Sequence, residues 1–267
     1  MPELPDVENY GRYMKRHALR QKITGVSVGD KRVLRKLPIA RLRNRTVGRR
    51  FTAVRRHGKH LLARLDDGGW ITFHFGMTGS FAYFKDGKDP AYDRLRFDFA
   101  NGRHLGFIDP RLFGQIGIAD DDDDFIKRQK LGPDALDRSF TARRFKELLA
   151  GRKGNVKTAL MDQTLIAGVG NIFSDEILFR ARIHPRTPVT RLDAQRITAL
   201  YRAMRAVLTG AIARGAGDDK FTARLPKSWF LPHRDKNERC PRCGGPIKTV
   251  RFAARTAYFC PRCQKPR

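Results

Sequence analysis

The first half of the chain contains short hydrophobic runs in which apolar and polar positions often alternate. Residues 70–75, 95–99 and 105–108 are examples, and glycine or polar residues bound each of them. When apolar and polar residues alternate along a strand, they point to its opposite faces. We therefore expect antiparallel strands of a sandwich or barrel. A helix over residues 8–19 is expected ahead of them. The acidic run 120–124 is expected to be a solvated turn.

The pattern changes at about residue 135, where apolar positions recur with the spacing of helices. We expect helices over 140–150, 156–163, 171–181 and 193–214, with Ser139, Asn171 and Asp193 as N-caps. A glycine turn at residues 168–170 separates the second of these helices from the third. Backbone amides in this turn and at the following helix start, Gly170 included, can cradle a phosphate. A generic helical hairpin is the alternative.

These hydrophobic patterns predict an α+β chain with four parts. An antiparallel β-sandwich domain is expected over residues 1–130 and a helical domain over 131–215. A connector rich in glycine, proline and charge covers 216–239, and a small cysteine-bearing module covers 240–267.

The net charge of the chain indicates what kind of partner it binds. The 267 residues include 55 Lys and Arg against 27 Asp and Glu, which gives a net charge of +28. Such an excess favours a polyanionic partner, most simply nucleic acid, and a generally basic protein is the alternative. No run of apolar residues reaches the ~18 needed to span a membrane. The N-terminus does not resemble a signal peptide, so we expect a cytoplasmic protein with no membrane partner.

Four cysteines predict a metal site. Cys240, Cys243, Cys260 and Cys263 form the pattern C-x2-C-x16-C-x2-C. Each C-x2-C pair can turn two sulfurs toward one ion, and a β-hairpin between the pairs would close a tetrahedron. Four thiolates leave no open position, so one structural Zn²⁺ is expected. A redox dithiol is the alternative, although it would need only one pair.

Six motifs in order resemble one known family along nearly the whole chain. They are Pro2-Glu3-Leu4-Pro5-Asp6-Val7-Glu8, Gly58-Lys59-His60, Gly76-Met77-Thr78-Gly79, Asp109-Pro110-Arg111-Leu112-Phe113-Gly114, the segment around Asn171, and the zinc finger with Arg255. In this combination the chain resembles bacterial formamidopyrimidine-DNA glycosylases, which form a superfamily with endonuclease VIII. The resemblance implies a β-sandwich, a helix-two-turn-helix domain and a zinc finger on a β-hairpin.

The resemblance also implies a chemistry. After removal of Met1, the secondary amine of Pro2 would attack C1′ of a damaged nucleotide and form a Schiff base, with β- or β,δ-elimination following. Glu3 would protonate the sugar ring oxygen. Lys59 would contact phosphate, and Arg255 would assist elimination. Without the family resemblance, the Pro2-Glu3 sequence would predict only an ordinary turn.

The remaining expected contacts are with damaged double-stranded DNA. The target base must leave the stack, and by the resemblance Met77, Arg111 and Phe113 would fill the space it leaves. Asn171 and Arg255 would clamp phosphates, and Gly170 and His74 complete the expected DNA-contacting set. Taken singly, Met77 and Phe113 would be assigned to the core. The family further implies a monomer that acts on the bacterial nucleoid.

The chain departs from the family after the last long helix. Residues 215–230 lack the usual lesion-capturing sequence, so the opposite base stays open, and ring-opened purines, oxidised pyrimidines and bulky adducts all remain possible lesions. Trp229 and Phe230 could stack on an extruded base or serve the fold. A DNA-binding protein without catalysis is one rival function, and a monofunctional nuclease or a ribosome-associated zinc protein is the other. The Pro2-Glu3 start argues against the first, and the absence of clustered metal-binding carboxylates argues against the second.

Overall fold

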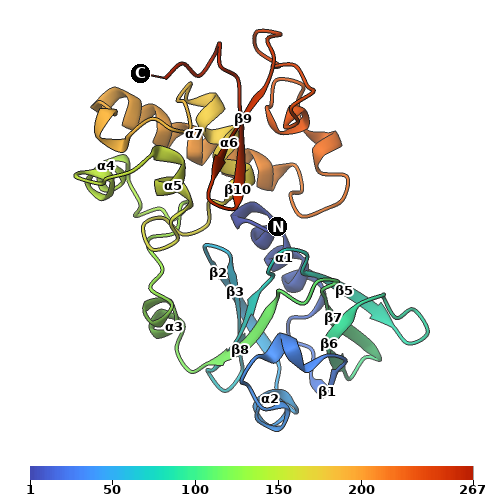
Figure 1. Ribbon diagram of the computed structural model, residues 1–267. Helices are drawn as coiled ribbons and strands as arrows, with labels where there is room; N and C mark the ends of the chain where they lie inside the picture. Colours follow the sequence, from blue (N-terminus) through green and yellow to red (C-terminus); the bar gives the residue numbers. More distant parts are fainter. Residues whose placement is uncertain (267) are drawn as a thin grey trace. The chain divides into compact units, whose positions relative to one another are not determined.

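The computed structural model describes residues 1–266, and they divide into two compact units (Figure 1). The first unit contains Met1–Pro2 and Asp6–Gln129. The second contains Glu3–Pro5 and the chain from Lys130 onward. The three residues Glu3–Pro5 therefore pack with a part of the chain that lies far away in sequence.

The first unit is a sandwich of two antiparallel four-stranded sheets. One sheet has the order β1-β6-β7-β5 and the other the order β2-β3-β4-β8. The strands are β1 (Ile23–Val28), β2 (Phe51–His57), β3 (His60–Leu65), β4 (Trp70–His74), β5 (Ser80–Lys85), β6 (Asp93–Phe99), β7 (Arg103–Ile108) and β8 (Gln115–Ala119).

Aromatic side chains from both sheets form the core of the sandwich. On β6 every second side chain is buried, namely Leu95, Phe97 and Phe99. Phe97 meets Phe51 of the other sheet edge-to-face, with ring centroids 5.3 Å apart. Alternation along the strands thus puts one face of each sheet into a shared core, which confirms the predicted antiparallel sandwich.

Helices α1 (Leu4–His17), α2 (Ile39–Thr46) and α3 (Asp122–Arg128), with the 3-10 turn η1 (Lys31–Leu34), complete this part of the chain. Two expectations were wrong here. The first helix begins at Leu4, ahead of the expected start at residue 8. The acidic run is the start of α3, because the Asp121 carboxylate accepts a hydrogen bond from Asp124 N and caps the helix.

The second unit is mainly helical. It contains α4 (Ala142–Leu149), α5 (Val156–Met161), α6 (Asn171–Arg180) and α7 (Ala194–Ala213), and the 3-10 turns η2 (Val189–Arg191), η3 (Thr222–Arg224) and η4 (Leu231–His233). Their apolar faces share one core, as the periodicity predicted.

The helix caps of this unit differ in part from the expectation. Asp193 caps α7 as predicted. Thr141 caps α4 in place of Ser139, whose hydroxyl is bonded to Asp137 Oδ1 at 2.7 Å. Asn171 is the first residue of α6 rather than its cap, and Gly170 occupies the cap position without a side chain to offer.

The hairpin of β9 (Lys248–Phe252) and β10 (Arg255–Phe259) lies between the two cysteine pairs, as expected. It packs on α6 through a small core in which Phe179 stacks on Phe230 at 4.8 Å. Trp229 and Phe230 are buried, so they serve the fold in this structure and are not available to stack on a base.

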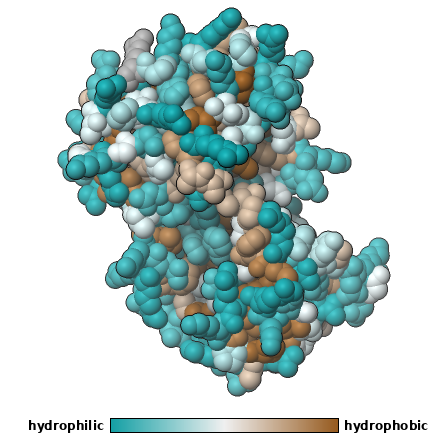
Figure 2. All heavy atoms as spheres, in the orientation of Figure 1, coloured by the Kyte–Doolittle hydropathy of each residue, from teal (hydrophilic) through white to brown (hydrophobic). Residues whose placement is uncertain are grey.

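The surface of both units is mainly hydrophilic on the face drawn in Figure 2. None of the helices described in residues 1–266 has both the length and the hydrophobicity needed to cross a bilayer.

Candidate functional site

In the first unit, Lys59 stands at the tip of the β2–β3 hairpin. His57 and His60 are the last paired residues of the two strands, so Gly58 and Lys59 form a two-residue turn. Gly58 has a φ of 56° and Lys59 has no positive φ, a pattern typical of a type II′ hairpin turn. The turn thus presents the Lys59 side chain at one end of the sheet, where it is half-buried.

His74 lies beside this hairpin, at the end of β4. Its ring is 4.9 Å from that of His60, the residue with which it pairs across the sheet. Burial, with smaller electrostatic contributions from His74, His57 and Lys59, lowers the pKa of His60 to about 3. Burial also lowers the pKa of His74, with Lys59 and Arg35 adding to the effect.

The neutral His74 ring has a defined tautomer. Its Nδ1 accepts a hydrogen bond of 3.3 Å from the N–H of Gly76, so the ring proton resides on Nε2. His74 therefore offers one neutral donor rather than a positive charge.

Met77, Arg111 and Phe113 lie on two loops that a buried carboxylate joins. Asp109 is fully buried, and its Oδ1 accepts hydrogen bonds from the Thr78 hydroxyl at 2.7 Å and from Arg111 N at 3.2 Å. Its Oδ2 accepts from Gly114 N at 2.6 Å. One carboxylate thus holds Arg111 itself and the residues that follow Met77 and Phe113.

The two loops also touch through their backbones. Gly76 has a φ of 58°, and a Cβ there would collide with the carbonyl carbon of Phe113. The loop side chains themselves point outward, with Met77 38% and Phe113 47% exposed. The Arg111 guanidinium lies 5.1 Å from the centroid of the Phe113 ring. Neither Met77 nor Phe113 is a core residue.

Pro2 precedes α1 and is half-buried. Glu3, the next residue, belongs to the second unit and is fully buried there. Its Oε2 accepts from Gly170 N at 2.7 Å and from Phe173 N at 3.2 Å, and its Oε1 accepts from Ile172 N at 2.8 Å. The Glu3 carboxylate therefore caps α6 from a distant part of the sequence.

This cap changes the role expected for the glycine turn. The amides of Gly170, Ile172 and Phe173 are occupied by Glu3 and do not form a cradle for phosphate. Gly170 is required for a different reason, since a Cβ at this position would collide with the Glu3 carboxyl carbon. The sequence could not show this, because the cap joins residues 167 positions apart.

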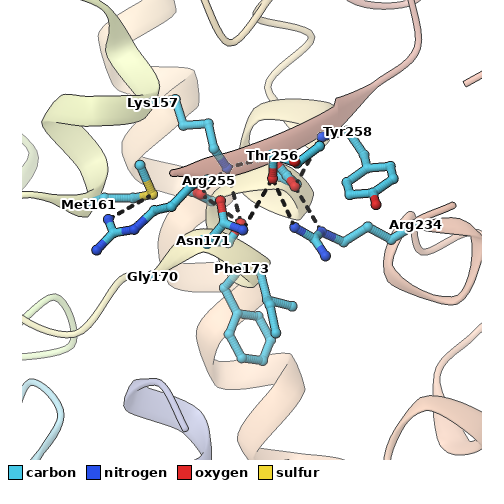
Figure 3. Close-up of polar contacts among 12 residues, drawn as sticks. Lys157, Met161, Gly170, Asn171, Phe173, Arg234, Arg255, Thr256 and Tyr258 are labelled. Carbon is cyan, nitrogen blue, oxygen red and sulfur yellow. Dashed lines mark hydrogen bonds and ion pairs between the residues drawn. The ribbon is translucent and has the colours of Figure 1, made fainter. Parts of the chain in front are cut away.

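Asn171 and Arg255 lie at the junction between α6 and the β9–β10 hairpin (Figure 3). Asn171 Nδ2 donates to the carbonyl oxygen of Thr256 at 3.2 Å. Arg255 is exposed at the start of β10, and its Nη1 lies 3.8 Å from the sulfur of Met161 on α5. The hairpin thus brings Arg255 to the same end of α6 as Asn171.

A buried ion network, which the sequence interpretation missed, holds this junction together. Lys157 Nζ donates to Asp175 Oδ1 at 2.6 Å, and both side chains are fully buried. Asp175 Oδ2 accepts from Arg234 Nε at 2.8 Å and from Tyr258 N at 3.2 Å. Burial lowers the pKa of Lys157 below its ordinary value, while Asp175 acts in the opposite direction. The network ties α5, α6, the connector and β10 together.

Glu176, the neighbour of Asp175, anchors the connector in the same way. Its Oε2 accepts from the N–H groups of Phe230 and Leu231 at 2.7 and 2.9 Å. Burial raises the pKa of Glu176, and Arg180 opposes that shift. Two adjacent acids among the mostly apolar residues of α6 were the sequence signal that could have identified these anchors.

The four cysteine sulfurs lie within 4.8 Å of one another. The Cys240–Cys263 and Cys243–Cys260 sulfur pairs are 3.8 and 3.5 Å apart. Tetrahedral Zn–S bonds of about 2.3 Å imply sulfur separations of roughly 3.8 Å, so the cluster fits a metal site of this kind.

Comparison with known proteins covers almost the whole chain. Residues 1–116 match the model of the formamidopyrimidine-DNA glycosylase N-terminal domain, 131–222 match the H2TH domain of the same protein, and 237–266 match the zinc finger found in FPG and IleRS.

Whole proteins agree with these matches. The formamidopyrimidine-DNA glycosylases of Pelotomaculum thermopropionicum and Halorhodospira halophila are each 35% identical to the chain. The alignments cover 99% of this chain and 99% and 100% of those proteins.

Solved structures show the same similarity. The Lactococcus lactis formamidopyrimidine-DNA glycosylase bound non-covalently to DNA with an AP site aligns with a TM-score of 0.88 at 29% identity. That alignment covers 99% of this chain and 100% of the other. A further structure is a mutant of the same enzyme in complex with DNA that contains Fapy-dG, at a TM-score of 0.88 and 29% identity. The chain belongs to the formamidopyrimidine-DNA glycosylase family, the DNA-binding glycosylases of base excision repair.

Proposed function

We propose that the chain is a bifunctional DNA glycosylase and AP lyase that removes oxidised or ring-opened purines. The observation that carries the proposal is the full-length match to this family together with an intact Pro2-Glu3 start. The similarity to enzymes solved with AP-site and Fapy-dG DNA favours these substrates.

In the proposed reaction, removal of Met1 frees the secondary amine of Pro2. An α-amine has a pKa near 8, so a useful fraction is neutral at physiological pH. The neutral nitrogen attacks C1′, the glycosidic bond breaks, and the base leaves with that electron pair and takes up a proton. Opening of the sugar ring then gives an iminium ion between Pro2 and C1′. The iminium acidifies the C2′ hydrogens, so loss of one expels the 3′ phosphate by β-elimination.

Glu3 is proposed to take up the proton that the Pro2 nitrogen loses when it bonds to C1′, and to pass it to the sugar ring oxygen. The N–H groups at the start of α6 hold the Glu3 carboxyl group in a fixed position, which supports a role in proton transfer. Lys59, on its hairpin turn, is proposed to bind phosphate and orient the lesion. Arg255 is proposed to assist departure of the second phosphate if δ-elimination follows.

The proposed DNA contacts fall on both units. The exposed Met77, Arg111 and Phe113 would occupy the space left by the extruded base, with Arg111 bonding the unpaired partner base. Asn171 and Arg255 would clamp the flanking phosphates, and His74 would donate from Nε2. Gly170 would act indirectly, by admitting the Glu3 carboxylate to the helix start.

One structural Zn²⁺ is proposed for the four cysteines, since thiolates in this arrangement are typical zinc ligands. The metal would hold the hairpin that carries Arg255. We further propose that the protein acts as a monomer.

Borohydride trapping tests the reaction. Incubation with a duplex that contains an abasic site should give a covalent adduct, because the reductant converts the iminium into a stable amine. Trapping should vanish with a chemically blocked N-terminus, and it should weaken in Pro2→Gly, which offers a primary amine in place of the secondary amine. DNA binding without any adduct would favour a damage-binding protein that lacks catalysis.

A further inference from the structure

Met77 differs from the other internal methionines in its exposure to solvent. The chain contains five methionines, and the structure describes all of them. Met14 and Met204 are fully buried and Met161 is 7% exposed, whereas Met77 is 38% exposed. Once Met1 is removed, an oxidant that arrives from solvent therefore reaches the Met77 thioether before that of any other methionine.

The loop that carries Met77 is held in its exposed conformation. It joins β4 to β5, and the N–H of Gly79 donates to the carbonyl oxygen of Phe75 at 2.8 Å across the turn. The next residue, Thr78, donates its hydroxyl to the buried Asp109 at 2.7 Å. The turn cannot fold inward to bury Met77 without breaking these bonds, so the side chain stays accessible in the free protein.

The chemistry available at the Met77 sulfur is a two-electron oxidation by a peroxide. A sulfur lone pair forms the S–O bond while the O–O bond breaks, and the rest of the peroxide takes up a proton and leaves as water or an alcohol. The thioether becomes a sulfoxide, and a methionine sulfoxide reductase returns it to the thioether at the expense of a thiol. Oxidised bases are among the proposed substrates, so their formation and this reaction share one class of oxidant.

The sulfoxide does not suit the proposed role of Met77. An unbranched thioether adapts to the apolar space between stacked bases. The sulfoxide oxygen is a strong hydrogen-bond acceptor, and its burial without a donor is unfavourable. Of the three proposed space-filling side chains, Met77, Arg111 and Phe113, only Met77 carries a sulfur.

We propose that Met77 is a modification site, where oxidation by a peroxide to the sulfoxide weakens binding to duplex DNA with a lesion or an abasic site. The proposal rests on the space-filling role given to Met77 in the proposed function. Bound DNA would cover the side chain, so the free protein is the form that becomes modified and the complex is protected.

Peroxide treatment of the full-length, zinc-loaded protein tests the proposal. Peptide mass spectrometry locates the added oxygen, with and without a saturating duplex that carries a tetrahydrofuran analogue of an abasic site. The affinity for the same duplex is then measured by fluorescence anisotropy, which needs no catalysis. Zinc content is measured alongside, because a peroxide also oxidises thiolates and Cys243 is exposed.

Met77→Leu and Met161→Leu are the matched variants. Each removes one thioether and keeps an apolar side chain of similar volume. Met77→Leu has its own starting affinity, so each protein is compared with itself before and after treatment.

We expect the sulfoxide to form first at Met77, and saturating duplex to suppress it. The affinity of the wild type and of Met161→Leu should fall at least about fivefold, as expected for burial of one polar group without a partner. Met77→Leu should keep its starting affinity. Methionine sulfoxide reductase with dithiothreitol should restore the wild type.

Borohydride trapping on a single-stranded abasic site separates this proposal from the proposed function. A single strand has no opposite base and no stacked space to fill, so peroxide treatment should leave trapping unchanged. Absence of trapping in the untreated protein would be a failure of the proposed reaction, whereas the affinity measurement would still decide the role of Met77.

Three results would overturn the proposal. Full affinity in protein that carries the sulfoxide at Met77 would show that the modification has no effect. An equal loss in Met77→Leu would assign the effect to another residue, such as a cysteine. Oxidation of Met77 at the same rate in saturating duplex would place its side chain outside the DNA contact.

Discussion

The backbone N–H of Gly170 donates a hydrogen bond of 2.7 Å to the side chain of Glu3, 167 positions away in the sequence. Glu3 is thus both the proposed acid of the reaction and the cap of α6. A substitution at Glu3 therefore changes two properties, and an activity assay alone would not separate them.

We expect Glu3→Gln to destabilise the start of α6 as well as to abolish base excision. Both carboxylate oxygens accept N–H groups, and an amide replaces one of those acceptors by a donor. An unsatisfied buried group costs about 1–3 kcal/mol. Hydrogen exchange of peptides covering residues 170–176 should become faster. Glu8→Gln is the matched control, since its partly exposed ion pairs with Arg12 and Arg56 contribute little. Unchanged exchange in Glu3→Gln would show that the cap does not stabilise the helix.

Asp109→Asn should loosen the two loops that carry Met77, Arg111 and Phe113. The amide cannot accept at both positions where Asp109 receives hydrogen bonds from Thr78, Arg111 and Gly114. We expect a stability loss of about 1–3 kcal/mol and roughly tenfold slower excision from duplex DNA.

The substrate provides the internal control for Asp109→Asn. Trapping on a single-stranded abasic site, which has no partner base to hold, should change less than excision from a duplex. The exposed Asp66→Asn should behave as the wild type in both assays. Equal losses on single and double strands would contradict a role for Asp109 in positioning the loops.

Local sequence patterns predicted the fold because strand periodicity and metal-binding turns depend only on residues close together in the sequence. The buried Leu95, Phe97 and Phe99 repeat with the period of a strand, and the spacing of Cys240 and Cys243 is that of a metal-binding turn. These features need no knowledge of the rest of the chain.

The caps and buried ions could not be predicted in the same way. Ser139 and Thr141 are both good N-caps, and only the competing bond from Ser139 to Asp137 decides between them. Lys157 and Asp175 are 18 positions apart, and each alone has the pattern of a surface charge. Which charges become buried partners depends on how α5 and α6 pack.

Asp175→Asn should be more damaging than the loss of one hydrogen bond implies. It would leave Lys157 buried without its counter-charge and would remove an acceptor for Arg234. Breaking one partner of a buried pair costs about 3–5 kcal/mol. Adding Lys157→Met should recover part of that loss, as measured by denaturant unfolding of the single and double variants. Additive losses would show that the two side chains are not coupled.

Removal of the metal should release the hairpin from α6. Cys240 and Cys260 belong to the small core with Phe179 and Phe230, so loss of the ion would disturb that packing. We expect one zinc per chain by colorimetric assay, and at least about tenfold weaker DNA binding after chelation. Restoration by Zn²⁺ and not by Mg²⁺ is the control. Full DNA affinity in the metal-free protein would contradict a structural role for the ion.

The final prediction concerns pH and the histidines beside Lys59. Burial lowers the pKa of His60 to about 3 in the folded chain, against about 6.5 in the unfolded chain. The unfolded state therefore binds more protons below pH 6.5, so the contribution of neutral His60 to stability is complete above pH 6.5 and is lost as the pH falls toward 3. Between pH 7 and pH 5 the loss should be about 1–2 kcal/mol.

His60→Gln removes the titrating group and should flatten this dependence. Urea unfolding of the wild type and the variant at pH 7 and pH 5 measures the difference, and other acid-sensitive groups, including the cysteines, cancel in the comparison. His74→Gln should change the dependence in the same direction, because burial lowers the pKa of His74 as well. Parallel losses in the wild type and His60→Gln would mean that His60 is not held neutral by the fold, and Lys59 would then lie next to a second positive charge at low pH.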